Sequence, residues 1–431
     1  MNPISVNELT ESVNSNLPRD IKSTIAKNIL AEEKNSDVAK KIFSELINNL
    51  SSKTQREVIN ATGTVLHTNL GRSPNNISFS GSYTNIEYDL KTLSRGKRNE
   101  YLSVLMNNLI GSKDIAFVNN NASSLFLSLK AISKSHNIQN VIISRGEIIE
   151  IGGSYRLPEI INETDLNLVE IGTTNKTKLN DYSKALEKYP SSLILKVHRS
   201  NFSINGFTED VSIKELAELK NKFDVFIFHD LGSGLVIDKK FLEINNVSIF
   251  KDEPFVQDSL SDGANLVMFS GDKLFGSVQS GIIAGDDSLV NEIKNYSLFR
   301  TYRCSPITLF ELQETVLKYI NKQEKEIPFW NLITQPYSSL EKRCKNIAKS
   351  ISFSTSIEKG ESVIGGGTLP DVTLESPILL LNNEKTINTI NQLIRNDIPI
   401  IPRIIKDQVC LDLRSVFHNQ DDIIVQALNN S

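Results

Sequence analysis

Three short groups of polar residues carry the chemistry that this sequence could perform. NNNASS (119–124) opens a predicted helix after an apolar run, His229 and Asp230 follow DVFIF, and SGDK (270–273) follows NLVMF. A helix start with free amides and small polar side chains can bind an anion. A carboxylate at a buried strand end is costly unless it meets a cation. A lysine at the same sheet edge can act as a Schiff-base nucleophile.

Together, the three groups match what one cofactor requires. Pyridoxal phosphate needs a lysine for its aldehyde, a carboxylate for its pyridinium nitrogen and a cradle for its phosphate. The sequence offers the cradle, then Asp230, then Ser-x-x-Lys ending at Lys273, 43 positions after the aspartate. This order and spacing are typical of the fold type I group of pyridoxal-phosphate enzymes. We therefore predict pyridoxal 5′-phosphate as the cofactor.

Other sites built on glycine-rich loops or cysteines fit the sequence poorly. It contains no GxxxxGK[ST] P-loop and no GxSxG hydrolase elbow, and DLGSG (230–234) lacks the GxGxxG spacing of a dinucleotide site. Cys304, Cys344 and Cys410 lie far apart, without CxxC or Cys/His metal spacing. We expect three reduced thiols and no metal ion.

A sheet has to bring the three polar groups together. Short β-branched runs alternate with amphipathic segments such as 122–133, 179–188 and 212–223. The runs are AFVNN (115–119), NVIISR (140–145), LNLVEIG (166–172), SLILKVH (192–198), DVFIFHDL (224–231), NLVMFSGD (265–272) and SGIIAG (280–285). This alternation predicts an α/β fold with a mostly parallel seven-stranded sheet and helices on both faces. Ligands of such sheets bind at the carboxyl ends of the strands.

Two further regions flank the predicted sheet. Residues 1–57 have apolar positions at helical spacing and eight basic against eight acidic side chains, which predicts a helical N-terminal domain without a basic arm. We place the large cofactor-binding domain at 58–320, with a long helix over 306–320 at its end. Alternating short runs in 321–431 predict a small α+β C-terminal domain.

The charge and the apolar content of the sequence bear on whether the protein binds nucleic acids or membranes. The 431 residues have a net charge of −4, from 47 basic and 51 acidic side chains, so global charge gives no reason to expect nucleic acid. No run approaches the roughly 20 apolar residues of a membrane span, and the first residues resemble no secretory signal. We expect a cytoplasmic protein that does not bind membranes.

Eight stretches of the sequence resemble the family of bacterial selenocysteine synthases, the L-seryl-tRNA(Sec) selenium transferases. They are INATGTVLHTNLGR (59–72), SRGEIIEIGGSYRLPEII (144–161), EIGTTNKT (170–177), LKVHRSNFSINGF (195–207), HDLGSG (229–234), SGDKLFGSVQSGII (270–283), GGGTLP (365–370) and VCLDLRSV (409–416). The likeness covers about residues 56–420. It implies a fold type I transferase that assembles as a homo-oligomer built from dimers.

The resemblance also implies roles for individual residues. Lys273 would bind the aldehyde of the cofactor, and Asp230 would pair with its pyridine nitrogen. The phosphate would be held by Asn120, Asn121 and Ser270, with His198 and Asn201 beside the ring. The selenium donor would be held by Arg95, Arg98, Arg300 and Arg303. Arginine suits a small tetrahedral oxyanion because its donors are planar, paired and permanently charged.

The implied reaction converts L-seryl-tRNA(Sec) to L-selenocysteinyl-tRNA(Sec). The serine hydroxyl would leave by β-elimination, and selenium from selenophosphate would add in its place.

Two alternatives to this reaction stay open. One is a pyridoxal-phosphate paralogue, a lyase or transferase, that acts on a small amino acid or sugar-acid phosphate without tRNA. The other is a protein that has lost catalysis and serves as an RNA-binding or assembly partner.

Overall fold

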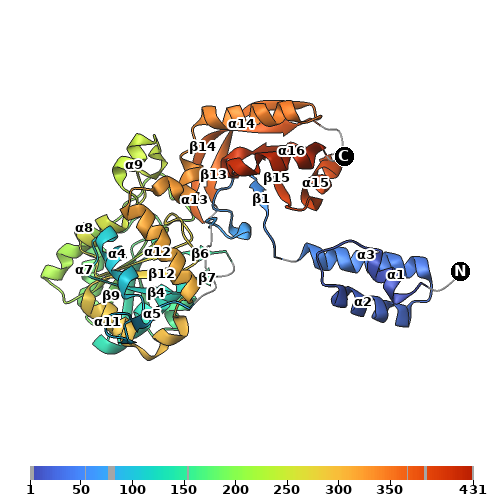
Figure 1. The fold of residues 1–431 in the computed structure, drawn as a ribbon. Coiled ribbons are helices and arrows are strands. Elements are labelled where there is room, and N and C mark those ends of the chain that lie inside the picture. The colour runs from blue at the N-terminus through green and yellow to red at the C-terminus, as the bar shows by residue number, and fades with distance from the viewer. Residues whose placement is uncertain are drawn as a thin grey trace. The chain divides into compact units, whose positions relative to one another are not determined.

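The computed structural model describes residues 4–53, 55–75, 83–152, 155–365, 367–382 and 386–429 (Figure 1). The chain divides into two compact units. One consists of Met1–Val58 with the short stretch Asp397–Pro399, and the other consists of Ile59–Asn396 with Ile400–Ser431. The second unit contains both large sheets of the described chain and all the residues predicted to bind the cofactor.

The first unit contains three helices in its described residues. They are α1 (Val6–Glu11), α2 (Arg19–Glu32) and α3 (Ser36–Ser52). Ser5 and Glu8 form a capping box at the start of α1, and the Asn35 side chain caps α3. The helices enclose a small core of Leu9, Ala26, Ile29, Ala39, Phe43 and Ile47. This is the helical N-terminal region that the periodicity predicts.

The second unit is built on a seven-stranded sheet with the order β4-β12-β11-β10-β9-β5-β8. Its strands are β4 (Asp114–Val118), β5 (Asn140–Ser144), β8 (Asn167–Ile171), β9 (Ser192–Val197), β10 (Ile227–Gly232), β11 (Leu266–Ser270) and β12 (Gly281–Gly285). Strand β12 is antiparallel to both of its neighbours, and the other pairs are parallel. All seven predicted runs form strands, so the expected mostly parallel sheet is confirmed.

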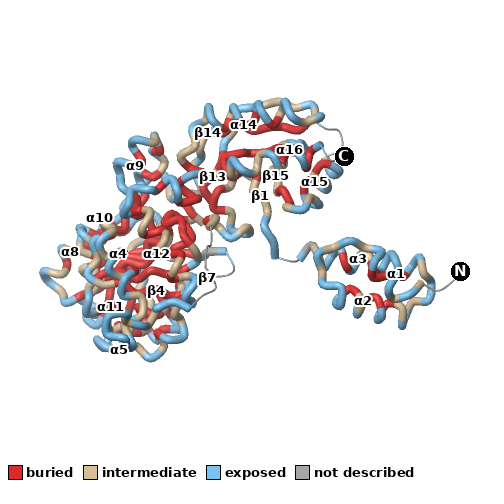
Figure 2. Tube along the Cα trace, in the orientation of Figure 1, coloured by how far each residue is buried: buried red, intermediate tan, exposed pale blue. Residues whose placement is uncertain are grey.

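Helices cover both faces of this sheet, as predicted. Along β11, Val267 and Phe269 belong to one apolar core, while Leu266 and Met268 belong to the other. Because successive strand residues point to opposite faces, this alternation requires apolar cover on each side. All five residues of β11 are buried, and Figure 2 shows buried chain in the interior of this part of the protein. The first core takes side chains from α4 (Glu100–Ile110), α7 (Leu179–Lys188), α8 (Ile213–Glu218), α10 (Val256–Ser261) and α12 (Pro306–Ile320). The second takes them from α5 (Asn121–His136), α6 (Leu157–Asn162) and α11 (Asp287–Asn295).

A five-stranded sheet with the order β1-β15-β16-β14-β13 forms the C-terminal part of this unit. Its strands are β1 (Ile59–Ala61), β13 (Thr355–Gly365), β14 (Thr368–Leu381), β15 (Ile400–Ile405) and β16 (Gln408–Asp412). The accompanying helices are α13 (Pro328–Ile333), α14 (Tyr337–Ser350), α15 (Thr386–Arg395) and α16 (Asp421–Asn429). Among the described residues, every helix is too short or too polar to cross a membrane.

Strand β1 lies within the range predicted for the large domain, but it pairs in parallel with β15 of the C-terminal sheet. The Ser415 hydroxyl, in a 3-10 helix that follows β16, also binds the β1 segment: it donates to the Asn60 carbonyl oxygen at 2.7 Å and accepts from the Gly63 amide at 2.9 Å. Gly63 has φ +76°, and a Cβ there would lie 2.0 Å from Oδ2 of Asp412. The motif INATGT therefore needs glycine where it crosses β16.

Candidate active site

A cavity of about 260 Å³ lies at the carboxyl ends of the central strands. Its lining residues include Asn120, Asn121, His198, Asp230, Ser270 and Lys273, six of the seven residues predicted to bind the cofactor. They come from the ends of β4, β9, β10 and β11, which lie at one edge of the sheet. The sheet therefore brings together residues that are up to 153 positions apart in the sequence (120 to 273).

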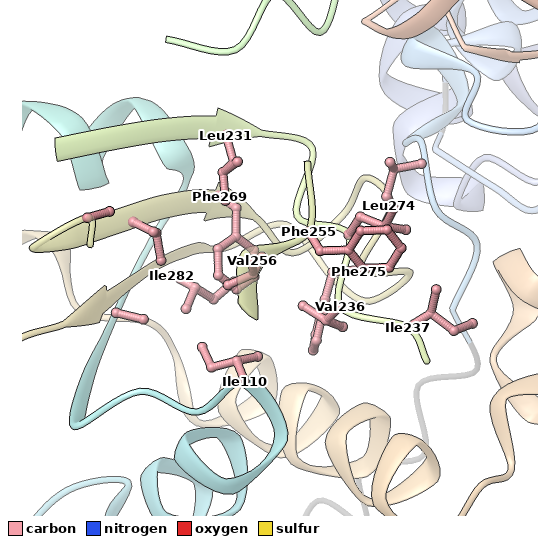
Figure 3. Close-up of a cluster of buried hydrophobic side chains, with 14 of the residues drawn as sticks. Ile110, Leu231, Val236, Ile237, Phe255, Val256, Phe269, Leu274, Phe275 and Ile282 are labelled. Carbon is pink, nitrogen blue, oxygen red and sulfur yellow. The ribbon is translucent and has the colours of Figure 1, made fainter. Parts of the chain in front are cut away.

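Lys273 is buried on a loop that apolar residues hold in place. The next two residues, Leu274 and Phe275, are fully buried in the core with Phe269 (Figure 3). The amide of Leu274 also donates to the carbonyl oxygen of Ser233 at 3.0 Å. Burial, with a smaller contribution from the positive charge of Arg72, lowers the pKa of the Lys273 amine to about 8, against the opposing negative charge of Asp230. At pH 7 roughly a tenth of this amine is therefore neutral and nucleophilic, far more than of an ordinary lysine.

Asp230 is a buried carboxylate with one oxygen already bound. Its Oδ1 accepts hydrogen bonds from Nδ2 of Asn121 at 2.7 Å and from the Gly232 amide at 3.1 Å. Burial raises the pKa of Asp230, while the bond from Asn121 and the charge of Lys273 lower it. Within the described chain no hydrogen bond is made by Oδ2, so this oxygen can accept from a ligand.

The predicted anion cradle lies at the start of α5. The Asn120 side chain caps the helix by accepting from the Ser123 amide at 2.8 Å. Strand β12 passes close by, since a Cβ on Gly281 would lie 2.1 Å from the Asn120 carbonyl oxygen. Ser270 is buried and also lines the cavity. Asn121 points its amide at Asp230, so it links the cradle to the carboxylate.

His198 and Asn201 follow β9 but lie in different surroundings. His198 lines the cavity, and its Nε2 lies 3.1 Å from Oε1 of Glu253. Asn201 is absent from the described lining residues of this cavity, and its Nδ2 donates to the Glu150 carbonyl oxygen at 3.1 Å. Its role beside the ring thus remains a prediction.

Three of the four predicted donor-binding arginines line a second cavity of about 540 Å³. Arg95 and Arg98 both contact Glu87, at 3.2 and 2.8 Å, and Arg98 also donates to the Cys304 carbonyl oxygen at 2.7 Å. These arginines lower the pKa of Glu87, chiefly through the hydrogen bond from Arg98. Arg303 lines the same cavity, and its Nε is buried without a hydrogen-bond partner in the described chain.

The second cavity and the Lys273 cavity share no described lining residue, so in the described part of one chain the arginines and the lysine line separate cavities. Arg300, the fourth arginine, is exposed and is not among the described lining residues of either cavity.

Several cavity residues had no role in the sequence-based prediction. Arg72, Tyr155, Asp272 and Gln279 all line the Lys273 cavity, and NH1 of Arg72 lies 2.9 Å from Oδ2 of Asp272. Each of these four residues belongs to one of the motifs that carry the family resemblance, so the motifs could have identified them as candidate site residues. Glu253 lies outside every such motif and carried no signal.

The residues at this edge of the sheet fit pyridoxal phosphate. A buried amine with a lowered pKa, a buried carboxylate with one available oxygen and the first turn of a 16-residue helix supply the three partners that this cofactor needs. Oδ1 of Asn121 is also buried without a partner in the described chain, and it can accept a hydrogen bond from a ligand.

A solved structure supports the fold class. The structure of D-glucosaminate-6-phosphate ammonia-lyase aligns with a TM-score of 0.59 and 16% sequence identity, over 89% of this chain and 97% of that protein. The fold class predicted from the sequence, that of the fold type I transferases, is confirmed. Pyridoxal phosphate is the cofactor of this group, as the prediction requires.

Sequence comparisons identify the family. The model of the family described as L-seryl-tRNA selenium transferase matches residues 58–417. The L-seryl-tRNA(Sec) selenium transferase of Campylobacter fetus subsp. fetus is 37% identical over 421 residues, which cover 95% of this chain and 92% of the relative. The enzyme of the same name from Aquifex aeolicus is 37% identical over 405 residues, 91% of this chain and 86% of the relative. The chain belongs to the L-seryl-tRNA selenium transferase family, a family of enzymes.

Proposed function

We propose that this protein converts L-seryl-tRNA(Sec) to L-selenocysteinyl-tRNA(Sec), with pyridoxal 5′-phosphate as cofactor and selenophosphate as selenium donor. The observation that carries the proposal is the joint placement of Lys273, Asp230 and the α5 cradle in one cavity of a chain of this family. The names of its relatives support the substrate, because those relatives are enzymes that act on seryl-tRNA(Sec).

Lys273, Asp230, Ser270 and the start of α5 each have a task in this proposed reaction. Bound pyridoxal phosphate supplies an electron sink for the charge left when the Cα–H bond of serine breaks. Asp230 holds a proton at the ring nitrogen through its available Oδ2, and the start of α5 with Ser270 binds the phosphate. The Lys273 amine, with a pKa of about 8, accepts the Cα proton once it is free of the cofactor. The β-hydroxyl then takes up a proton and leaves as water. The selenium of selenophosphate adds at Cβ while Cα regains a proton, and hydrolysis of the Se–P bond releases phosphate.

Arginine guanidinium groups bind the selenium donor. Arg303 offers a buried, unbonded Nε in the described chain, and Arg95 and Arg98 lie in the same cavity. Arg72 brings a permanent positive charge to the Lys273 cavity itself. Because the two cavities of one chain are separate, the arginine cavity of a second copy would have to supply the donor. We therefore propose a homo-oligomer built from dimers, acting in the cytoplasm.

The direct test is a reconstituted reaction. The full chain is incubated with pyridoxal phosphate, seryl-tRNA(Sec) and labelled selenophosphate, and the amino acid on the tRNA is analysed after hydrolysis. We expect selenocysteine with the wild-type protein and none with Lys273→Ala, which also loses the absorbance of the covalently bound cofactor. Turnover or that absorbance in Lys273→Ala contradicts the role of Lys273.

The same preparation separates the alternatives. A wild-type protein that binds the cofactor but neither shifts seryl-tRNA(Sec) in a gel nor forms selenocysteine would be a paralogue acting on a small molecule. A protein that binds the tRNA without turnover would be a non-catalytic partner.

A further inference from the structure

A buried glutamate stands behind the imidazole of His198. Oε1 of Glu253 lies 3.1 Å from Nε2 of His198, and the glutamate side chain is 5% exposed. His198 lines the Lys273 cavity, whereas Glu253 is absent from its described lining residues. The carboxylate therefore contacts the imidazole from outside the cavity wall.

The segment that carries Glu253 is firmly attached to the core. It is a turn between a short 3-10 helix, η4 (Ser248–Phe250), and α10, and the Glu253 amide donates to the Phe250 carbonyl oxygen at 3.1 Å. The ring of Phe250 packs edge-on against Trp330, with centroids 5.4 Å apart. The amide of Val256 donates to the Leu235 carbonyl oxygen at 3.0 Å. The carboxylate is thus held by fixed backbone on both sides.

Packing does not account for a carboxylate at this position. Burying an acid is costly unless its oxygens have partners, and Oε2 of Glu253 is buried without a hydrogen bond in the described chain. Within the described residues the recorded side-chain partner of Glu253 is His198. The negative charge of Glu253 also reaches the site, since it raises the pKa of Lys273 together with Asp230 and Asp272.

The backbone of His198 is fixed by the neighbouring strand β10, because its amide donates to the Asp230 carbonyl oxygen at 2.8 Å. With Nε2 directed to Glu253, the ring nitrogen left for a ligand is Nδ1. We propose that Glu253 is a positioning residue that keeps the proton of His198 on Nε2 and fixes the ring, so that Nδ1 is the atom offered to bound cofactor or substrate. The identity of that ligand rests on the proposed function.

A double-mutant cycle on cofactor affinity tests this proposal. The cofactor-free full chain is titrated with pyridoxal phosphate, and absorbance gives the dissociation constant for wild type, Glu253→Ala, His198→Ala and the double variant. We expect Glu253→Ala to weaken binding about tenfold, the lower end of the effect known for the outer partners of metal-binding histidines. If Glu253 acts through His198, the double variant binds no more weakly than His198→Ala alone. Additive losses overturn the proposal.

The chain offers a matched control in a second histidine–glutamate pair. Nε2 of His136 lies 3.0 Å from Oε2 of Glu292, at a part-exposed site on α5 and α11 that is not among the described lining residues of the cavity. Glu292→Ala should leave the affinity for pyridoxal phosphate unchanged. An equal loss in Glu292→Ala means that the assay reports general destabilisation, and this also overturns the proposal.

A second readout needs no cofactor. In protein labelled with ¹⁵N-histidine, Glu253→Ala should change the imidazole nitrogen shifts of His198, while Glu292→Ala should not. The isosteric Glu253→Gln keeps the packing if the alanine variant fails to fold, and we expect it to weaken cofactor binding less. Wild-type affinity with unchanged His198 signals overturns the proposal. Failure of the seryl-tRNA reaction alone leaves it intact, because neither measurement uses tRNA or selenium.

Discussion

Lys273 differs from an ordinary lysine in the pH at which its amine becomes reactive. Burial first, and the charge of Arg72 second, lower its pKa from the ordinary 10.5 to about 8. Because the neutral amine attacks the cofactor aldehyde, we expect covalent capture of pyridoxal phosphate by the cofactor-free protein to accelerate as pH rises through about 8. Stopped-flow absorbance at a series of pH values measures this. A rate that still climbs steeply toward pH 10 would contradict the lowered pKa.

Replacing Arg72 should shift the pH midpoint of covalent capture, the pH at which the capture rate is half of its maximum. Arg72→Gln removes a positive charge that disfavours the protonated amine, so the pKa of Lys273 and the midpoint should both rise. The control is Arg19→Gln, an exposed position in the first unit. The prediction fails if the two variants share the wild-type midpoint.

Individual residues show which parts of the candidate site can be predicted from the sequence alone. Lys273 and Asp230 could be found because each follows an apolar run whose strand end is the expected ligand edge. The bond from Asn121 to Asp230 could not be found, because it depends on how the start of α5 faces β10. Glu253 was also out of reach, since it lies on a turn 55 positions from His198 and only the packed fold brings the two together.

At the scale of elements, Gly63 allows two distant motifs to interlock. It has φ +76°, and a Cβ added at this position would lie only 2.0 Å from Asp412, whose carboxylate is hydrogen-bonded to Ser362 and Ser376. We expect Gly63→Ala to destabilise the protein by about 2–5 kcal/mol, from a left-handed backbone and an overpacked contact. Thermal unfolding measures the loss.

Gly71 provides the comparison for this variant. It has φ +92°, but a Cβ there meets no atom within 4 Å. Gly71→Ala should therefore cost only about 1–2 kcal/mol, from backbone strain alone. Equal losses in the two variants would mean that the contact with Asp412 contributes little.

Elements were predicted well where amphipathic or apolar patterns are strong. Helices α7 and α12 begin and end at the predicted residues, 179–188 and 306–320. In the hairpin of β13 and β14 only the end ILLLN (378–382) has a continuous apolar run that indicates a strand, because charged and polar residues interrupt the rest. The antiparallel direction of β12 could not be predicted from the sequence, because an apolar run such as GIIAG indicates a buried strand but not its direction.

At the scale of the whole molecule, the first unit has its own core and a balanced charge. We expect a chain that lacks residues 1–57 to keep its pyridoxal-phosphate affinity, because every described lining residue of the Lys273 cavity lies beyond that segment. If the first unit binds the tRNA, the truncated chain should bind seryl-tRNA(Sec) at least tenfold more weakly. Gel-shift titrations of both chains measure this, and equal tRNA affinity would remove that role.

The dependence of tRNA affinity on salt concentration is a further prediction about the same complex. With eight basic and eight acidic side chains in residues 1–57 and a net charge of −4 overall, few phosphates can be neutralised. Each neutralised phosphate contributes about −0.7 to −0.9 to the slope of log affinity against log salt concentration. We expect a shallow slope between 50 and 200 mM salt, on the order of −2 to −3. A slope near −8 would mean that a basic surface dominates binding.

The order of synthesis delays the pairing of strand β1. This strand leaves the ribosome before every other strand of the two large sheets, yet its partner β15 starts 341 positions later (59 to 400). At roughly 5–20 residues per second, β1 waits about 17–70 s with its backbone unpaired. During that interval the INATGT segment is an exposed strand edge, which other nascent chains or chaperones can bind. The motif that leads to Arg72 and the Lys273 cavity is thus among the first parts made and the last to fold.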